Sequence, residues 1–181
     1  MFSHIHPDNY QSQLDEKQQS ITADFAEFEL PAFEIFTSPT LNYRQRAEFR
    51  VWHEGDDLYY IMFDSDTKQK FRVDDFPVAS ELINQFMSAL LADIKDKEVL
   101  RQRLFQVDFL ATLSGEVLVS LLYHKQLDEQ WLEQAKQLKA RLSAIAPVDI
   151  IGRARKQKVI LDKDYVMETL TVGEKQFHYQ Q

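Results

Sequence analysis

The side chains of this sequence best suited to binding chemistry stand on one predicted strand, over residues 43–53. The stretch is rich in aromatic and β-branched residues, lacks proline and glycine, and alternates in polarity. Successive strand side chains point to opposite faces. A guanidinium suits phosphate because it is planar and always charged, and a neighbouring aromatic ring suits an unstacked base. The polar face carries Arg44, Arg46, Glu48, Arg50 and Trp52, and the apolar face carries Tyr43, Gln45, Ala47, Phe49 and Val51.

This strand also has a plainer interpretation, in which the Arg and Glu side chains are simply solvated. The alternating pattern alone favours that interpretation, because single amphipathic strands are common in sheets. The phosphate-binding interpretation therefore needs support from other parts of the chain.

Charge is spread unevenly along the 181 residues. The formal net charge is −8, and residues 1–40 hold seven acidic groups and one Lys. Nucleic acid responds to the local field of a basic patch more than to the molecular total. The acidic chain is therefore compatible with RNA binding at a local stripe. That stripe, over residues 150–163, contains Arg153, Arg155, Lys156, Lys158 and Lys163 against Asp162.

Several classes of chemistry are excluded or disfavoured within this sequence. It has no cysteine, which excludes disulfides, thiolate zinc sites and a Cys nucleophile. No apolar run reaches about 18 residues and no signal peptide is recognised, so we expect no membrane span and a cytoplasmic location. The pair His4 and His6 has no nearby carboxylate beyond Asp8, so no metal site is predicted. The four glycines are far apart and no acid/base pair stands out, so no catalytic residue is predicted.

The predicted elements favour an α+β fold with a largely antiparallel sheet built from β-hairpins. Two amphipathic helices are expected to pack on this sheet, and a polar N-terminal helix is expected to pack loosely. The division expected is an N-terminal helix with an extended segment over 1–40 and an α+β RNA-recognition domain over 41–181. Strands are predicted at 43–53, 58–63, 69–73, 104–112, 117–124, 148–154, 158–161, 165–170 and 177–179, and helices at 8–28, about 77–94 and 128–145.

The hairpin of residues 104–124 brings a second pair of candidate residues together. If Ser114 and Gly115 form a two-residue turn, constant-sum pairing places Phe105 directly opposite His124. A longer loop would shift this register and remove the pairing. The pair is either a histidine packed on an edge phenylalanine or a platform that stacks and hydrogen-bonds a splayed base. Residues predicted on the same face as Phe105 are Val107, Phe109, Leu118 and Leu122.

Long ordered motifs in this sequence resemble the bacterial tRNA (uracil-5-)-methyltransferases. The resemblance covers essentially all 181 residues and is too long to arise by chance. The motifs are Phe36-Thr-Ser-Pro39, the run from Tyr43 to His53, Asp56-Asp-Leu-Tyr59, the run from Phe76 to Asn84, Ser120-Leu-Leu-Tyr-His-Lys125 and Ile151-Gly-Arg-Ala154.

The resemblance implies a role in S-adenosylmethionine-dependent methylation of the T-loop uridine of tRNA at C5. In that family a Cys thiolate attacks C6 of the flipped-out uracil, a carboxylate base removes the C5 proton, and both lie in a Rossmann-like domain beyond the region seen here. We therefore expect a fragment that binds the T-arm, carries no cofactor site or metal, and is inactive alone. The family's RNA-contacting residues correspond to Glu48, Arg50, Phe105 and His124.

Two other functions remain open from the sequence. The chain could be a non-catalytic module that assists tRNA folding, or a protein-interaction domain that uses the acidic segment 1–40. The complete set of predicted RNA-binding residues is Arg44, Arg46, Glu48, Arg50, Trp52, Phe105, His124, Arg153 and Arg155.

Overall fold

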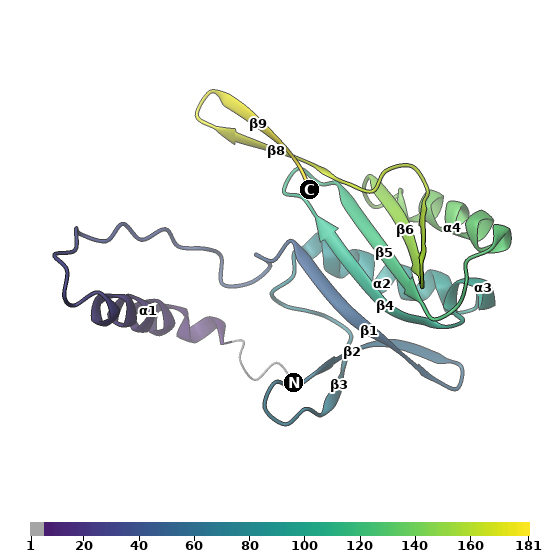
Figure 1. Ribbon diagram of the computed structural model, residues 1–181, viewed down its shortest axis with the longest axis horizontal. Coiled ribbons are helices and arrows are strands. Elements are labelled where there is room, and N and C mark those ends of the chain that lie inside the picture. Colours follow the sequence, from purple (N-terminus) through teal and green to yellow (C-terminus); the bar gives the residue numbers. More distant parts are fainter. Residues whose placement is uncertain (1–5) are drawn as a thin grey trace.

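A seven-stranded sheet forms the centre of the protein, and helices cover one of its two faces (Figure 1). The computed structural model describes residues 6–181. The strand order is β3-β2-β1-β4-β5-β6-β7, and a separate two-stranded sheet pairs β8 with β9. The strands are β1 (Arg46–Glu54), β2 (Asp57–Phe63), β3 (Lys70–Val73), β4 (Leu104–Ala111), β5 (Val117–Tyr123), β6 (Val148–Ala154), β7 (Gln157–Ile160), β8 (Met167–Val172) and β9 (Lys175–Gln180).

Two of the helices, α2 (Glu81–Ile94) and α4 (Glu129–Leu142), begin at residues whose side chains cap the first turn. The Ser80 hydroxyl accepts a hydrogen bond from Ile83 N at 3.3 Å, and the Asp128 carboxylate accepts one from Trp131 N at 2.8 Å. Such caps satisfy backbone N–H groups that the first turn leaves without partners. Both long sheet-packing helices direct an apolar stripe at the sheet, as predicted. The helices are η1 (Pro7–Asn9), α1 (Tyr10–Asp24), α2 (Glu81–Ile94), α3 (Glu98–Arg101) and α4 (Glu129–Leu142).

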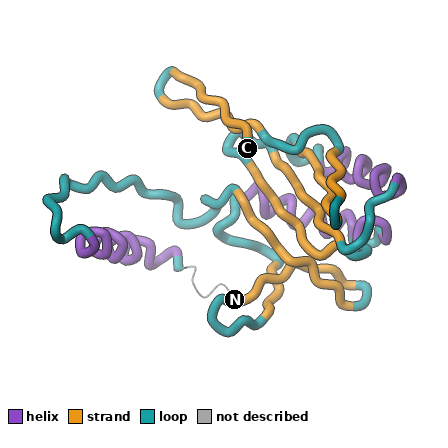
Figure 2. The backbone as a smooth tube through the Cα atoms, in the orientation of Figure 1, coloured by secondary structure: helices purple, strands orange, loops and turns teal. Residues whose placement is uncertain are grey.

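Hairpin pairing builds most of the sheet, which confirms the predicted α+β class with a largely antiparallel sheet (Figure 2). Among the strand pairs of the described residues, only β5 and β6 run parallel, with α4 as the crossover between them. Parallel neighbours require such a crossover because a tight turn reverses the chain direction. This pair places Leu122 beside Arg153, a contact that no local hairpin pattern predicts.

The core between the sheet and the helices is strongly aromatic. The Phe49 ring lies 5.3 Å from the Tyr60 ring and 5.5 Å from the Phe76 ring, measured between centroids. Trp131 of α4 is completely buried under the other half of the sheet. Gly152 of β6 faces this indole so closely that an added Cβ would lie 2.7 Å from Cζ2 of Trp131.

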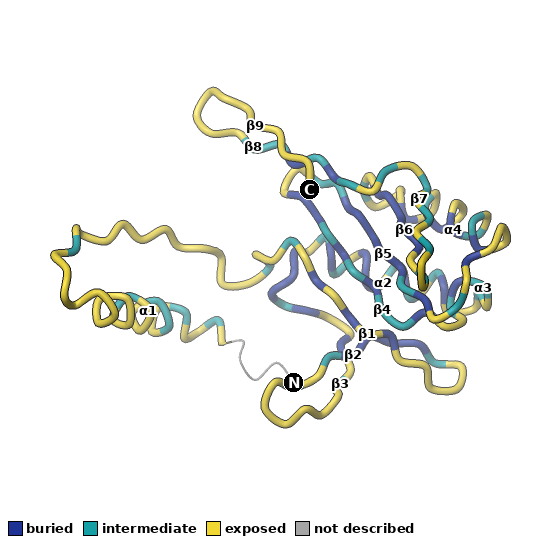
Figure 3. The backbone as a smooth tube through the Cα atoms, in the orientation of Figure 1, coloured by how far each residue is buried: buried dark blue, intermediate teal, exposed yellow. Residues whose placement is uncertain are grey.

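The N-terminal helix is shorter than predicted and separate from the core. Helix α1 ends at Asp24, whereas the sequence pattern predicted that the helix continues to residue 28. Neither η1 nor α1 contains a buried residue, and Figure 3 shows the N-terminal region almost wholly exposed. The sequence predicted that this helix packs loosely, and its lack of buried residues agrees with that prediction. The division of the chain at residue 40 stays a prediction.

The β8–β9 hairpin projects beyond the end of the main sheet and is held at its base (Figure 1). The buried Glu168 carboxylate accepts hydrogen bonds from Leu113 N at 2.6 Å and Ser114 N at 3.0 Å. Val166 packs on Leu118 and Ile151, on the sheet face that the helices leave uncovered. These contacts attach the hairpin to the β4–β5 turn.

Across residues 6–181, no helix combines the length and the apolar character that a membrane crossing requires.

Candidate nucleic-acid interface

The predicted two-faced strand is present as β1. Ala47, Phe49 and Val51 are buried, and Arg46 and Arg50 are exposed between them. The apolar residues pack toward α2 because the strand alternates. The polar residues therefore stand on the sheet face opposite the helices, which we call the open face.

The register of the β4–β5 hairpin differs from the prediction by one residue. Thr112 N donates to the Glu116 carbonyl at 2.9 Å, so the loop has three residues and Ala111 pairs with Val117. In this register Leu118 does not share a face with Phe109, which pairs with Val119. The predicted two-residue turn is wrong, because Gly115, at φ +96°, is the last residue of a three-residue loop.

A β-bulge at Phe105 nevertheless brings Phe105 and His124 together. The pairing shifts between Leu104 and Gln106, which leaves Phe105 as the extra residue. Leu104 and Val107 are both buried on the core side, although strict alternation would place residues three positions apart on opposite faces. The break in the alternation falls at Phe105. A bulge re-aims a side chain in this way and is frequent next to binding sites. Without it, Phe105 would point into the core.

The two rings form a parallel stack. Their centroids are 3.8 Å apart and their planes differ by 15°. The guanidinium carbon of Arg50 lies 5.5 Å from the centroid of the Phe105 ring, within the range of a cation–π contact. Phe105 is half-buried and His124 is exposed. The outer element of this layered group is therefore an imidazole ring open to solvent.

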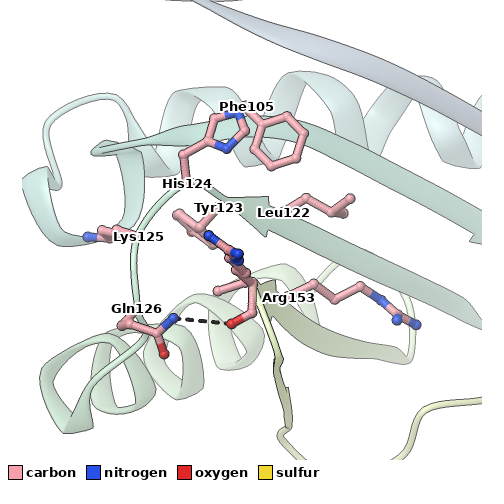
Figure 4. A pocket seen from close by; sticks show the side chains of 9 residues that line it. Phe105, Leu122, Tyr123, His124, Lys125, Gln126 and Arg153 are labelled. Atoms are coloured by element: carbon pink, nitrogen blue, oxygen red, sulfur yellow. Dashed lines mark hydrogen bonds between the residues drawn. The ribbon is translucent and has the colours of Figure 1, made fainter.

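A groove of about 550 Å³ runs beside the stack, between the end of β5 and the β6–β7 turn. Figure 4 shows Phe105 and His124 ring against ring on one side of it and Arg153 on the other. Among residues 6–181, the Arg153 and Arg155 side chains form no ion pair. The lining residues are Phe105, Leu122, Tyr123, His124, Lys125, Gln126, Arg153, Ala154 and Arg155.

A second hollow of about 460 Å³ lies on the other side of the same stack. Phe105 and His124 line both hollows, so the stack forms a ridge between them. His53, which the sequence left as an ordinary exposed side chain, borders the second hollow and shares a 2.7 Å hydrogen bond with the Leu104 carbonyl. This bond helps hold the backbone beside the bulge.

A row of paired residues crosses the open face from β1 to β6. Arg50 pairs with Gln106, Gln106 with Leu122, and Leu122 with Arg153. At about 4.8 Å between neighbouring strands, the two guanidinium-bearing positions are roughly 14 Å apart. Sequence reasoning did not name Gln106, and it placed Leu122 on the face of Phe105 but not beside Arg153, because that neighbour follows only from the sheet order.

The remaining predicted residues do not line the groove, and the guanidinium carbon of Arg44 lies 5.8 Å from the ring centroid of the buried Phe76. The exposed Arg46 forms an ion pair with Glu48 at 2.5 Å. Arg44 precedes β1, where its backbone bridges to Ala79. The Trp52 ring is 38% exposed, and the Lys70 ammonium lies 3.3 Å from its centroid. These contacts leave the Trp52 ring partly covered and Arg46 partly neutralised.

Comparison with models of known protein families identifies the family of this chain. A family model described as tRNA (Uracil-5-)-methyltransferase matches residues 9–181. The chain belongs to the tRNA (uracil-5-)-methyltransferase family. The resemblance found in the sequence is thereby confirmed.

Individual members of this family match the chain at high identity. The tRNA/tmRNA (uracil-C(5))-methyltransferase of Colwellia psychrerythraea is 70% identical over 181 residues, which are 100% of this chain and 50% of that protein. The enzymes of the same name from Vibrio parahaemolyticus and Shewanella frigidimarina are 58% and 59% identical over 98% and 97% of the chain, and 48% of each enzyme is covered. The chain thus spans about half the length of these methyltransferases.

The resemblance implied S-adenosylmethionine as the methyl donor of the family, and the groove does not fit that molecule. Carboxylates bind the ribose hydroxyls in many nucleotide-cofactor sites, and none lines the groove. None of the four glycines lines the groove, and Gly152 faces Trp131 in the core. We assign no cofactor to residues 6–181.

No group of three potential metal ligands occurs among the residues that the structure describes. Of the N-terminal histidine pair considered in the sequence, His4 lies outside the described residues. His6 is exposed.

A half-buried carboxylate, Asp108, lies on the open face opposite Glu48. Burial raises the pKa of Asp108, and the Glu48 carboxylate opposite it on β1 raises it further, while a hydrogen bond from Gln106 Nε2 at 2.7 Å opposes the shift. A carboxyl whose pKa is higher in the folded than in the unfolded protein lowers stability once both states are ionised. Asp108 therefore costs stability at neutral pH.

Substituting Asp108→Asn is expected to raise the free energy of unfolding at pH 7. The gain should shrink as the pH falls through the folded-state pKa and be largely lost at pH 3.5, below the unfolded-state pKa of about 3.9. Urea unfolding of both proteins at pH 3.5, 5 and 7 measures this difference. Asp93→Asn is the contrasting variant and should lower the free energy of unfolding at pH 7. Burial raises the pKa of Asp93, but hydrogen bonds from Arg141 and Lys97 outweigh burial, so the pKa is lowered. Equal loss of stability in both variants at pH 7 would contradict the account of Asp108.

Proposed function

We propose that this chain is the tRNA-binding half of an S-adenosylmethionine-dependent tRNA (uracil-5-)-methyltransferase that acts on the T-loop. The observation that carries the proposal is the ring stack of Phe105 and His124 beside a groove lined by Arg153 and Arg155. Stacking surfaces next to unpaired guanidiniums are the combination that binds unstacked RNA. Family membership supports tRNA as the substrate.

In this proposal the phosphates of an opened T-loop lie along the cationic row. Arg50 and Arg153 stand roughly 14 Å apart across three neighbouring strand pairs. Arg155 extends the same edge of the groove. Guanidiniums bind phosphate through two parallel hydrogen bonds, so each of the three holds one phosphate. Arg44 and Arg46 serve the adjacent part of the arm.

A splayed base then extends the existing stack. Phe105 and His124 are already at ring-contact distance, so the base stacks on the exposed outer face of His124. Flipping a base out costs a few kcal/mol, and each aromatic stack contributes about 1–3 kcal/mol. The preformed pair therefore offsets most of the flipping cost without first having to be ordered itself.

The chemical step belongs to residues outside this chain. Methyl transfer to C5 requires covalent addition of a thiolate to the uracil ring, as the family resemblance implies, and a thiolate is a cysteine side chain. The 181 residues contain no cysteine. What these residues do in the reaction is to bind the T-arm, open the loop and hold the uridine away from its neighbours.

The salt dependence of tRNA binding tests the phosphate contacts. Replacing Arg50, Arg153 or Arg155 by Gln should each reduce the slope of log affinity against log salt by about 0.7, the value for one phosphate contact on a single strand. Filter binding of a T-arm hairpin between 50 and 200 mM KCl gives the slope. Lys136→Gln, on an exposed position of α4, is the matched control and should leave it unchanged. Unchanged slopes in all three arginine variants would contradict the proposed row.

A second function needs no cysteine nucleophile, because opening and refolding an RNA loop involves only binding. Opening the T-loop also disturbs the contacts between tRNA arms, so the chain alone could assist tRNA folding. A refolding assay, in which misfolded tRNA regains aminoacylation with and without the 181-residue protein, distinguishes this function. Absence of tRNA binding even at low salt would favour a protein-interaction role instead.

A further inference from the structure

The N-terminal arm, residues 6–43, is folded but has almost no contact with the core. It consists of η1, α1 and an extended segment, and none of the residues of η1 or α1 is buried. The Tyr10 hydroxyl accepts a hydrogen bond from Ser38 N at 2.9 Å, which closes the arm on itself. Only its base is attached, where Asn42 bonds the carbonyls of Pro77 and Ala79. Figure 1 shows the arm extending away from the sheet.

The arm exposes an unusual number of large apolar side chains. Phe36 is 87% exposed and Phe28 is 67% exposed, and the rings of Phe25 and Phe28 lie 6.2 Å apart at its tip. Solvated linkers are polar and poor in aromatic residues, and clustered exposed apolar groups mark an interaction surface. Of the sixteen large exposed hydrophobic residues within 6–181, half fall in the arm, namely Ile21, Phe25, Phe28, Phe33, Ile35, Phe36, Leu41 and Tyr43.

The charge of the arm limits the partner. Residues 1–40 hold seven acidic groups and one Lys. Phosphate repels such a segment, so neither RNA nor an anionic membrane surface is a suitable partner. The surface that covers the arm must be apolar, with basic side chains at its rim.

The family comparison indicates where that surface is. The match to the Colwellia psychrerythraea enzyme includes the whole arm and covers 50% of that enzyme. The arm is therefore a shared part of these proteins, and as much polypeptide again lies outside the matched region. We propose that the arm docks on this second half of the methyltransferase through its exposed Phe side chains, so that it joins the RNA-binding half to the other half. The inference rests on family membership and is independent of the proposed RNA-binding residues.

Hydrogen exchange tests the docking. The 181-residue protein is compared with a full-length protein in which these residues are joined to the second half of the Colwellia psychrerythraea enzyme. Amides of residues 21–43 should exchange rapidly in the short protein and at least about tenfold more slowly in the full-length one. Equal exchange in both proteins would overturn the proposal. Protection in the short protein that grows with its concentration would indicate a second copy as the partner, and would overturn it as well.

Substitutions in the arm provide a second readout. Phe28→Ala and Phe36→Ala should lower the midpoint of thermal unfolding of the full-length protein and leave that of the 181-residue protein unchanged, because neither ring contacts the core. Gln19→Ala, an exposed polar residue of α1, is the matched control and should change neither. Unchanged midpoints in the full-length Phe variants would contradict docking, as would equal losses in both proteins.

Discussion

Replacing either ring of the stack by alanine is expected to weaken binding of a tRNA T-arm by about 5- to 150-fold, the equivalent of one stack of 1–3 kcal/mol. The variants are Phe105→Ala and His124→Ala. The double variant should lose less than the product of the two single losses, because the rings act as one layered platform. Titration of a fluorescently labelled T-arm hairpin into each protein measures these affinities.

Both variants should stay folded, since His124 is exposed and Phe105 lies on the open face rather than in the core. Circular dichroism and thermal unfolding check this point. Phe177→Ala removes an exposed phenylalanine from β9, outside the groove, and should leave T-arm affinity unchanged. If both stack variants bind the T-arm as tightly as the unsubstituted protein, the rings have no stacking role.

The largest stability effect is expected at Gly152. A Cβ at this position would lie 2.5 Å from Leu127 Cδ1 and 2.7 Å from Trp131 Cζ2, with Trp131 Cη2 closer still. Alanine in place of glycine usually stabilises a compatible site by about 0.4–1 kcal/mol through the unfolded chain. Here overpacking against a completely buried indole dominates, and Gly152→Ala should destabilise the protein by about 1–3 kcal/mol or more. Urea unfolding at pH 7 measures the loss.

A double-mutant cycle separates this contact from a general effect on β6. Trp131→Phe creates space and is itself destabilising, but in the Gly152→Ala background it should recover part of the lost stability. Additive losses in the double variant would mean that the two side chains do not compete for the same space. An unchanged unfolding midpoint in Gly152→Ala would contradict the packing of α4 against β6.

The candidate site shows which inferences a linear pattern supports. Alternation along β1 predicted that Arg46 and Arg50 face away from Phe49, and burial confirms it. The Phe105–His124 pairing was predicted from a two-residue turn that does not exist. The pair forms instead because the bulge leaves Phe105 unpaired and turns its ring toward His124. A bulge leaves no mark in the hydrophobic pattern, because Phe105 fits a buried position as well as an exposed one.

By itself, the sequence determined the class of fold, the two faces of β1, the cap at Asp128 and the membership of the methyltransferase family. These features depend on the side-chain period, on capping chemistry and on ordered motifs, all of which act between near neighbours in the chain. The tertiary structure alone decided the β4–β5 register, the parallel β5–β6 pair and the bulge at Phe105. The Leu122–Arg153 pair, for example, forms only because α4 carries the chain back beside β5 and packs Trp131 on Gly152. Contacts of this kind depend on the packing of distant segments, so the groove beside the ring stack exists only in the folded sheet.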